Sequence, residues 1–437
     1  MMKISEMPKY QTYKDSTEGW IGDVPEHWDI RKLKHLFYEK KHRPNMSLNC
    51  GAISFGKVVT KDDEKILLST KASYQEVLSG EFLINPLNLN YDLISLRIAL
   101  SEIDVVVSAG YIVIREKEEL QKQYFKYLLH RYDVAYMKLL GSGVRQTISF
   151  NHIANSLLVF PPLEEQSLIA AFLDKKTALI DEAISIKEKQ INLLKERKQI
   201  IIQQAVTQGL DPNVPMKDSG VDWIGKIPAH WVLKKIKHVT SKIGSGVTPT
   251  GGGSTYLDDG IPLLRSQNIH FDRIDLTDVA RISNKTHEGM SNSKVKKGDV
   301  LLNITGGSIG RCYYVDSSDE MNVNQHVCIV RPNKIIKTVF LNAVLASEIG
   351  QGQIWYFQQG GGREGLNFQA LKNFYIALPP EAQQVEIAEY IDELEKEFYS
   401  AIQIQLMQIE KLKEYKTTLI NSAVTGKIKI TPEMVEQ

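Results

Sequence analysis

The feature that most constrains the fold is an internal duplication. Residues 14–35 (KDSTEGWIGDVPEHWDIRKLKH) and 217–238 (KDSGVDWIGKIPAHWVLKKIKH) are identical at 12 of 22 positions, at an offset of 203. Residues 161–207 and 379–425 are identical at 19 of 47 positions, at an offset of 218. The chain is therefore two copies of one unit, and such a duplication predicts an approximate two-fold axis, which suits a duplex DNA partner.

Each copy closes with a long stretch that predicts a helix. After Pro162 there is no Gly or Pro until Gly209, and the stretch opens with acidic residues, which stabilise a helix N-terminus. We expect one helix of about 45 residues, roughly 65 Å long at 1.5 Å per residue. The second copy predicts a matching helix from Glu381 to Thr425, which ends before Gly426.

A seven-residue spacing runs through both helices. Sustained heptads of apolar residues predict a coiled coil, and two helices of equal length predict mutual antiparallel packing. The alternative is two unrelated helices, each packed on its own domain. The seam residues are Leu173, Ile180, Lys187, Leu194 and Ile201 in the first helix, and Ile391, Phe398, Gln405, Leu412 and Leu419 in the second. The polar Lys187 and Gln405 are expected to lie near one central layer and to fix the register.

The regions between these helices have a different pattern. Short β-branched and aromatic runs are separated by Gly, Asn and Asp clusters, which predicts mixed α/β domains dominated by sheet. Helices are expected near residues 121–140 and 339–358. The predicted organisation is an α+β protein with a first domain at 1–160, a central helix at 161–210, a second domain at 211–378 and a C-terminal helix at 379–437.

Composition limits the class of protein. The 437 residues have 43% apolar content and a net charge of +1, and the three cysteines form no CxxC pair, so neither disulfides nor a zinc site is predicted. The N-terminal residues do not resemble a signal peptide, and no apolar run is long enough to cross a bilayer, so we expect a cytoplasmic protein without membrane partners. Near-neutral charge argues against a DNA binder that works alone.

Several segments together carry a family resemblance. The repeated WIGxxPxHW openings, the paired PPxxxQ helices, and SGVTPT, GIPLLRSQNI, KKGDVLLNITGGSIGR, NVNQHV and GGREGLNF in the second half resemble the specificity subunit of type I restriction-modification systems. The resemblance covers essentially the whole chain. The first half departs from it, because it lacks the GxTP loop and the glycine-rich GDVLLNITGGSIGR segment.

The resemblance implies two pseudo-symmetric target-recognition domains joined by two long antiparallel coiled-coil helices. Each domain would read one half of an interrupted double-stranded DNA site, and the helices would space the halves and dock two methyltransferase subunits. Restriction subunits would complete the complex. The chain itself would be non-catalytic and bind no cofactor, with S-adenosylmethionine, ATP and Mg²⁺ held by the partner subunits.

Base readout in a groove needs Arg or Lys for guanine and Asn or Gln for adenine, on loops that approach the duplex closely. Residues of these types, with hydroxyl and imidazole side chains beside them, gather on Gly-rich loops. The candidate DNA contacts are Thr248, Arg265, Ser266, Asn268, Thr305, Ser308, Arg311, Gln325, His326 and Arg363 in the second half, and Arg145, Gln146, Asn88, Asn90 and Arg97 in the first. No catalytic or metal-binding residue is predicted.

Other interpretations remain open at this point. The segment GAISFGKV imitates a phosphate-binding loop, but Val58 stands where a Mg²⁺-binding Ser or Thr is needed, which disfavours a nucleotide-dependent enzyme. A stand-alone DNA-binding regulator with two tandem domains is the main alternative. The His27-Trp28 and His230-Trp231 pairs invite a metal or stacking role, but their repetition at each domain entrance favours packing.

Overall fold

A computed structural model describes residues 3–87, 96–137, 140, 148–358 and 365–436 of the chain. The chain divides into two compact units. The first unit contains residues 1–187 and 406–437, and the second contains residues 188–405. Each unit therefore combines one sheet-rich part with a portion of each long helix.

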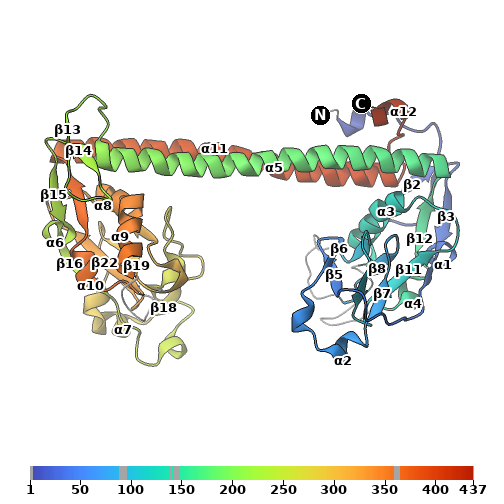
Figure 1. The fold of residues 1–437 in the computed structure, drawn as a ribbon, viewed down its shortest axis with the longest axis horizontal. Helices are drawn as coiled ribbons and strands as arrows, with labels where there is room; N and C mark the ends of the chain where they lie inside the picture. Colours follow the sequence, from blue (N-terminus) through green and yellow to red (C-terminus); the bar gives the residue numbers. More distant parts are fainter. Residues whose placement is uncertain (1–2, 88–95, 138–139, 141–147, 359–364, 437) are drawn as a thin grey trace. The chain divides into compact units, whose positions relative to one another are not determined.

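The long helices are α5 (Leu163–Gln208) and α11 (Glu381–Val424), which Figure 1 shows as unbroken. Their bounds agree within one residue with the stretches predicted to be helical after Pro162 and from Glu381 to Thr425, although α11 ends before the end of the region assigned to the C-terminal helix at 379–437. Gly209 follows α5 with a φ of 77°, and Gly426 lies just beyond α11 with a φ of 71°. These left-handed conformations favour glycine and end the helices, because a Cβ is strained there.

Within each unit the two helices pack antiparallel. In the first unit, Lys416 Nζ lies 2.6 Å from Asp181 Oδ2, and Lys187 Nζ donates to Gln408 Oε1. The contacting residue of α11 has a lower number when that of α5 has a higher one, so the two helices run in opposite directions. In the second unit, Lys198 pairs with Glu395. The predicted coiled-coil pairing is confirmed, and the alternative of two unrelated helices is wrong.

The predicted seam is the contact face in both units. Leu173, Ile180 and Leu419 are buried in the first unit, where Leu412 is half-buried. In the second unit Ile391 and Phe398 are buried, and Leu194 and Ile201 are half-buried. Lys187 and Gln405 are half-buried as well, and the idea that they share one layer remains a prediction.

The first unit is built around a four-stranded antiparallel sheet. Its strand order is β4 (Phe37–Glu39), β11 (Ile112–Glu116), β8 (Phe82–Ile84) and β9 (Ile98–Leu100). The smaller pairs are β1 (Tyr13–Asp15) with β2 (Asp23–Pro25), β3 (Asp29–Lys32) with β12 (Leu157–Phe160), β5 (Gly51–Ser54) with β6 (Lys57–Thr60), and β7 (Gln75–Val77) with β10 (Val105–Val107). The helices are α1 (Leu33–Leu36), α2 (Leu68–Lys71), α3 (Lys122–Ala135), α4 (Phe150–Ile153) and the C-terminal α12 (Pro432–Glu436).

The second unit repeats this plan. Its four-stranded sheet has the order β16 (Thr240–Ser245), β22 (Val327–Pro332), β19 (Val300–Asn303) and β20 (Cys312–Tyr314). A three-stranded sheet has the order β18 (Ala280–Ile282), β17 (Ile261–Leu264) and β21 (Asn322–Val323), and the pairs are β13 (Met216–Asp218) with β14 (Lys226–Pro228) and β15 (Val232–Lys235) with β23 (Tyr375–Leu378). The helices are α6 (Ile236–Val239), α7 (Asn284–Gly289), α8 (Thr338–Ala346), α9 (Glu348–Gln358) and α10 (Phe368–Lys372).

Each sheet shares its core with the long helices of its own unit. In the first unit the buried cluster joins Trp28, Phe37 and Tyr124 to Leu173 and Leu419. In the second unit it joins Trp231 and Phe340 to Ile202, Ile387 and Ile391. The helix pair is therefore part of each domain's hydrophobic core, and burial of these side chains stabilises the attachment.

The two predicted helices at the ends of the sheet domains differ from expectation. The helix expected at 121–140 is α3, which ends at Ala135. The helix expected at 339–358 is two helices, because Ser347 is extended with a ψ of 167°. Gly350 makes the corner possible, since a Cβ there would lie 2.4 Å from the carbonyl oxygen of Leu345. Across the described ranges, no helix is both long and apolar enough to span a membrane.

Candidate nucleic-acid interface

A tryptophan at the entrance of each unit is fixed by the start of a long helix. Trp28 is fully buried, and its indole Nε1 donates to Oε2 of Glu165 over 3.0 Å. Trp231 is 1% exposed, and its Nε1 donates to Oε1 of Gln383 over 2.8 Å. Glu165 and Gln383 are related by the offset of 218, so this contact is duplicated with the chain. We call the hydrogen bond between each tryptophan and the first turn of its long helix the clamp.

The neighbouring histidines belong to the same clamp. His27 Nε2 lies 2.6 Å from Glu165 Oε1, and His230 Nε2 lies 2.8 Å from Gln383 Oε1. The structural interpretation of the His-Trp pairs therefore fits the contacts. Burial alone would raise the pKa of Glu165, but hydrogen bonds from Tyr10, His27 and Trp28 lower it overall. Sequence reasoning missed Glu165 and Gln383, although their equivalent positions in the repeat could have indicated them.

The residues that follow Glu165 and Gln383 in the sequence hold the starts of α3 and α8 in place. Gln166 is buried, and its Oε1 accepts from the backbone N–H of Gln121, directly before α3. Gln384 is 1% exposed, and its Oε1 accepts from the backbone N–H of Lys337, directly before α8. These contacts satisfy helix N-termini and fix each sheet domain to its long helix.

Four predicted DNA contacts of the second unit form one chain of hydrogen bonds. Thr248 Oγ1 donates to Gln325 Oε1, and the amide Nε2 of Gln325 donates to Nε2 of His326 over 3.0 Å. Since that nitrogen accepts, Nδ1 carries the proton of neutral His326 and donates to Thr305 Oγ1 over 2.6 Å. Among the residues that the structure describes, one amide hydrogen of Gln325 and the hydroxyl hydrogen of Thr305 then have no acceptor.

The loop that carries Thr248 is fixed at its root by a glycine. The N–H of Gly246 donates to the carbonyl oxygen of Asn324 over 3.1 Å. A Cβ at Gly246 would lie only 1.7 Å from the carbonyl oxygen of Val323, so no other residue fits without moving the backbone. This close approach brings Thr248 to Gln325 although the two are 77 residues apart.

Ser266 and Ser308 lie close together through a buried amide. Asn303, at the end of β19, is fully buried, and its Nδ2 donates to the carbonyl oxygen of Ser266 over 2.8 Å and to Ser308 Oγ over 3.2 Å. The neighbouring Arg265 is half-buried, with its guanidinium carbon 5.7 Å from the ring centroid of Tyr256. Asn303 positions this part of the surface and was not predicted.

Asn268 does not fit its predicted role. It is 3% exposed, its Oδ1 accepts from the N–H of Arg265, and its Nδ2 donates to the carbonyl oxygens of Asp275 and Asp278. Its side chain is thus engaged by backbone groups. We therefore interpret Asn268 as a residue that shapes the loop carrying Arg265, and not as a base contact.

Arg97 and Arg311 occupy equivalent positions in the two sheets. Arg97 directly precedes β9, and its carbonyl oxygen accepts from Asn85 N–H over 2.7 Å. Arg311 directly precedes β20 and accepts from Asn303 N–H over 2.8 Å. Arg311 is half-buried, whereas Arg97 is 6% exposed with its Nε 3.0 Å from Asp133 Oδ1. The predicted DNA contact at Arg97 is therefore inconsistent with its burial.

The remaining predicted contacts lie outside the described residues. They are Asn88, Asn90, Arg145 and Gln146 in the first half and Arg363 in the second. In the second unit the candidate surface thus consists of Thr248, Thr305, Gln325 and His326, with Arg265, Ser266, Ser308 and Arg311 on neighbouring loops of the same domain. Hydroxyl, amide, imidazole and guanidinium groups of this kind can hydrogen-bond base edges and phosphates.

Comparison with known proteins identifies the family of the chain. Residues 25–196 and 229–410 match the type I restriction modification DNA specificity domain. The type I restriction enzyme EcoBI specificity subunit of Escherichia coli is 29% identical over 302 residues, which cover 66% of this chain and 63% of that subunit, less than two-thirds of its length. The MjaVIII specificity subunit of Methanocaldococcus jannaschii is 25% identical over 333 residues, covering 74% of this chain and 75% of that one.

A solved structure shows the same fold. One chain of a structure concerned with complex assembly and conformational transition of the type I R-M system has a TM-score of 0.67 to this chain at 16% identity. The match covers 92% of this chain and 98% of that one. Nearly the whole architecture is therefore shared.

Proposed function

Because this chain belongs to the family of type I restriction-modification specificity subunits and has two of their recognition domains, we propose that each domain reads one half of an interrupted DNA site. The observation that supports this most is the contrast within the repeat. The Trp28–Glu165 and Trp231–Gln383 clamps are duplicated, whereas the loops of the second domain that carry Thr248 and Gln325 have no close counterpart in the first. A shared framework with different loops suits two different half-sites.

In the second domain, the hydrogen-bonded chain from Thr248 to Thr305 is the proposed reading surface. Gln325 is exposed, and a glutamine amide can pair with the N6 and N7 atoms of adenine. The bonds from Thr248 and to His326 hold this amide in one orientation before DNA arrives. Such preorganisation reduces the entropy lost on binding.

The long helices are proposed to set the distance between half-sites. At 1.5 Å per residue, the 46 residues of α5 extend about 70 Å. At 3.4 Å per base pair, this length bounds the separation at about 20 base pairs. About one helical turn of DNA is the expected separation, because both domains must then face the same side of the duplex.

The helices are also proposed to dock two methyltransferase subunits. Each unit leaves two apolar side chains of α5 exposed at seven-residue spacing. In the first unit Leu179 is 50% and Ile186 is 49% exposed, and in the second Leu193 is 63% and Ile200 is 48% exposed. Apolar side chains that are repeatedly left exposed on a helix are typical of a surface covered by a partner.

The chemistry is proposed to reside in the partners. The methyltransferase subunits would use S-adenosylmethionine, and restriction subunits would use ATP and Mg²⁺, while this chain supplies sequence specificity without being an enzyme. Its place of action is the cytoplasm, where the DNA lies. The near-neutral charge of +1 fits this division, because partner subunits would contribute the phosphate contacts.

Methylome sequencing tests the proposal. Cells that carry this subunit with its methyltransferase should show modified adenines in an interrupted motif. Exchange of residues 211–378 for the same region of a relative should change one half of the motif and leave the other half unchanged. A motif that is continuous, or that changes in both halves after one exchange, would refute the proposal. Specific binding by the purified chain alone, without any modified motif, would support the stand-alone regulator instead.

A further inference from the structure

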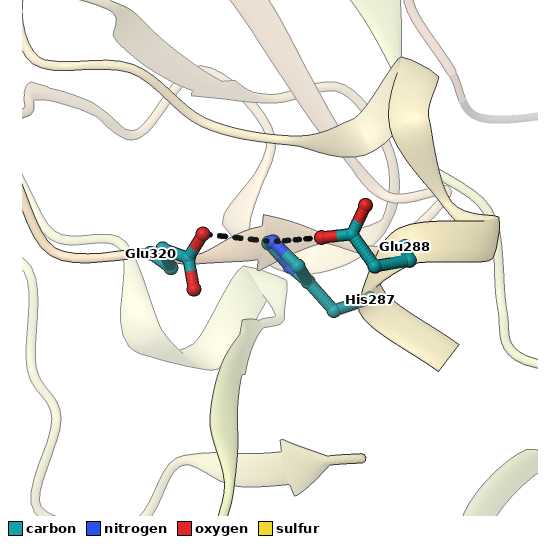
Figure 2. Close-up of side chains that lie close together, drawn as sticks. All are labelled: His287, Glu288 and Glu320. Carbon is teal, nitrogen blue, oxygen red and sulfur yellow. Dashed lines mark ion pairs between the residues drawn. The ribbon is translucent and has the colours of Figure 1, made fainter. Parts of the chain in front are cut away.

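A histidine and two glutamates meet in the second unit, and none of the three is a candidate DNA contact. Figure 2 shows the ring of His287 with one nitrogen between the carboxylates of Glu288 and Glu320. His287 and Glu288 belong to α7, whereas Glu320 lies two residues before β21. His287 is only 2% exposed, while the side chains of Glu288 and Glu320 are 70% and 67% exposed.

The contacts of Asn322 determine which nitrogen of His287 carries its proton. The amide Nδ2 of Asn322 donates to the carbonyl oxygen of Met290 over 3.2 Å and to Ser293 Oγ over 3.1 Å. Its Oδ1 therefore faces Nδ1 of His287, which must donate to it. In a neutral ring the lone pair then lies on Nε2, the nitrogen directed at the two carboxylates.

The Nε2 atom is buried and has no hydrogen-bond partner within the described part of the chain. It lies 3.6 Å from Glu320 Oε1 and 3.8 Å from Glu288 Oε1, too far for a hydrogen bond. Ligands about 2.1 Å from a tetrahedral cation are separated by roughly 3.4 Å, so small rotations of the exposed glutamates would bring all three atoms into contact with one ion.

We propose that His287, Glu288 and Glu320 bind one divalent cation of the first transition row, for which Zn²⁺ is the best match. One imidazole nitrogen and two carboxylate oxygens suit such ions, whereas Mg²⁺ prefers oxygen ligands alone. Asn322 acts on the ligand through its hydrogen bond to Nδ1, as the partners of metal-bound histidines commonly do. The three ligands leave room for water as a fourth.

Lys294 competes with the cation. Its ammonium lies 2.6 Å from Glu288 Oε1, so binding of the ion requires Lys294 to move or Glu288 to use its other oxygen. Removal of this ammonium should therefore strengthen cation binding. The same change would have no such effect if His287 were an imidazolium held by the two carboxylates.

The ion would connect α7 to the segment that leads into the proposed reading surface. Glu320 is followed by β21, which pairs with β17, and then by Gln325 and His326. Two exposed glutamates would gain a fixed position from the ion. Cation binding would thus stabilise the second domain and restrict the root of its reading loop, which is a property separate from the proposed DNA specificity.

Isothermal titration of the untagged full-length chain with ZnCl₂, in the absence of DNA, tests the inference. We expect one ion per chain and an increase in the thermal unfolding temperature. The double variant Glu288→Gln with Glu320→Gln should weaken binding roughly tenfold or more, and His287→Gln should act likewise. Glu348→Gln, at an exposed position of α9, is the matched control and should bind as the unaltered chain does.

Lys294→Met is the decisive second variant, because both carboxylates remain and the chain should fold. Tighter binding of Zn²⁺ supports the site. Absence of binding at millimolar Zn²⁺, or equal binding by the double glutamine variant, would overturn the inference, since the ion would then be absent or held elsewhere. MgCl₂ should bind more weakly than ZnCl₂, and the opposite order would exclude the imidazole nitrogen as a ligand.

Discussion

The indole nitrogen of Trp28 donates a hydrogen bond to the carboxylate of Glu165 over 3.0 Å. The residues are 137 positions apart, and the contact joins the entrance of the first domain to the first turn of α5. Tyr10 and His27 use the same carboxylate, so one side chain satisfies three donors. In the second unit Gln383 serves Trp231 and His230.

Loss of this carboxylate should destabilise the first unit. Glu165→Ala leaves the buried Trp28 nitrogen without an acceptor, at a cost of about 1–3 kcal/mol in the free energy of unfolding. Glu165→Gln keeps an acceptor and reproduces the second unit, so its effect should be smaller. Urea denaturation gives the free energies, and hydrogen exchange should locate the loss in residues 13–32. Equal effects of the two variants would show that the negative charge, and not the hydrogen bonds, matters.

His130 should make the first unit sensitive to mild acid. Burial, with a smaller contribution from the charge of Lys126, lowers the pKa of His130 to about 4 from its ordinary 6.5. The unfolded chain therefore binds the proton first, and stability falls as the pH drops from about 6.5 towards 4. At pH 5 the loss is on the order of 2 kcal/mol.

The variant His130→Gln tests this dependence. It should show a flatter stability curve between pH 7 and pH 5, measured by thermal unfolding. His42→Gln, at an exposed position of the same unit, is the control and should retain the original slope. An unchanged slope in His130→Gln would assign the acid sensitivity to other groups.

Substitutions of two leucines of α5 test the stability of the first unit and the docking of a partner separately. Leu173 is fully buried in the core of the first unit, so Leu173→Ala should cost about 2–5 kcal/mol. Leu179, six residues later, is 50% exposed, so Leu179→Ala should change stability little. If the exposed apolar residues dock a methyltransferase subunit, Leu179→Ala combined with Ile186→Ala should weaken that association. Analytical ultracentrifugation should show weaker association of this double variant with the methyltransferase subunit, while its free energy of unfolding is unchanged. Unchanged association would contradict docking at these residues.

Gln325 should determine specificity in only one half-site. Loss of its amide in Gln325→Ala should reduce discrimination at one base pair by about 1–3 kcal/mol. Competition binding of the assembled methyltransferase to half-site variants measures this change. Gln369→Ala, at an exposed position of α10, is the matched control. A uniform loss of affinity for all sequences would indicate a phosphate contact instead.

Shortening both long helices by one heptad should change the spacer. Deletion of residues 181–187 together with 399–405 removes equivalent segments, and about 10 Å of helix length corresponds to about three base pairs. Methylome sequencing should then show a shorter spacer between unaltered half-sites. An unchanged spacer would refute the idea that helix length sets the separation.

The regular parts of the molecule could be predicted from the sequence because their signals are local or repeated. The absence of Gly and Pro between Pro162 and Gly209 determines α5, and the heptads determine which face Leu173 and Ile391 present to the helix pair. The direction of polar side chains could not be predicted in this way. Asn268 and Arg311 are both polar and lie outside the sheets, yet Asn268 is buried with its amide bonded to backbone groups, whereas Arg311 is half-buried.

Contacts between segments that are distant in the sequence could not be predicted either. The equivalence of Arg97 and Arg311 depends on strand register, since the two halves differ in loop length and neither sequence offset relates these residues. Likewise, His287 and Glu320 are brought together by the positions of α7 and β21, and the 32 residues between them in the sequence carry no signal for that contact.

The division of the chain into units has a consequence for biosynthesis. The second unit is one continuous segment, residues 188–405, whereas the first needs residues 406–437 to complete its core around Leu419. As the chain leaves the ribosome, the domain that is encoded second is therefore the first to possess all of its parts. The domain encoded first must wait, with Leu173 and Ile180 still uncovered by α11, until residues 406–437 have emerged.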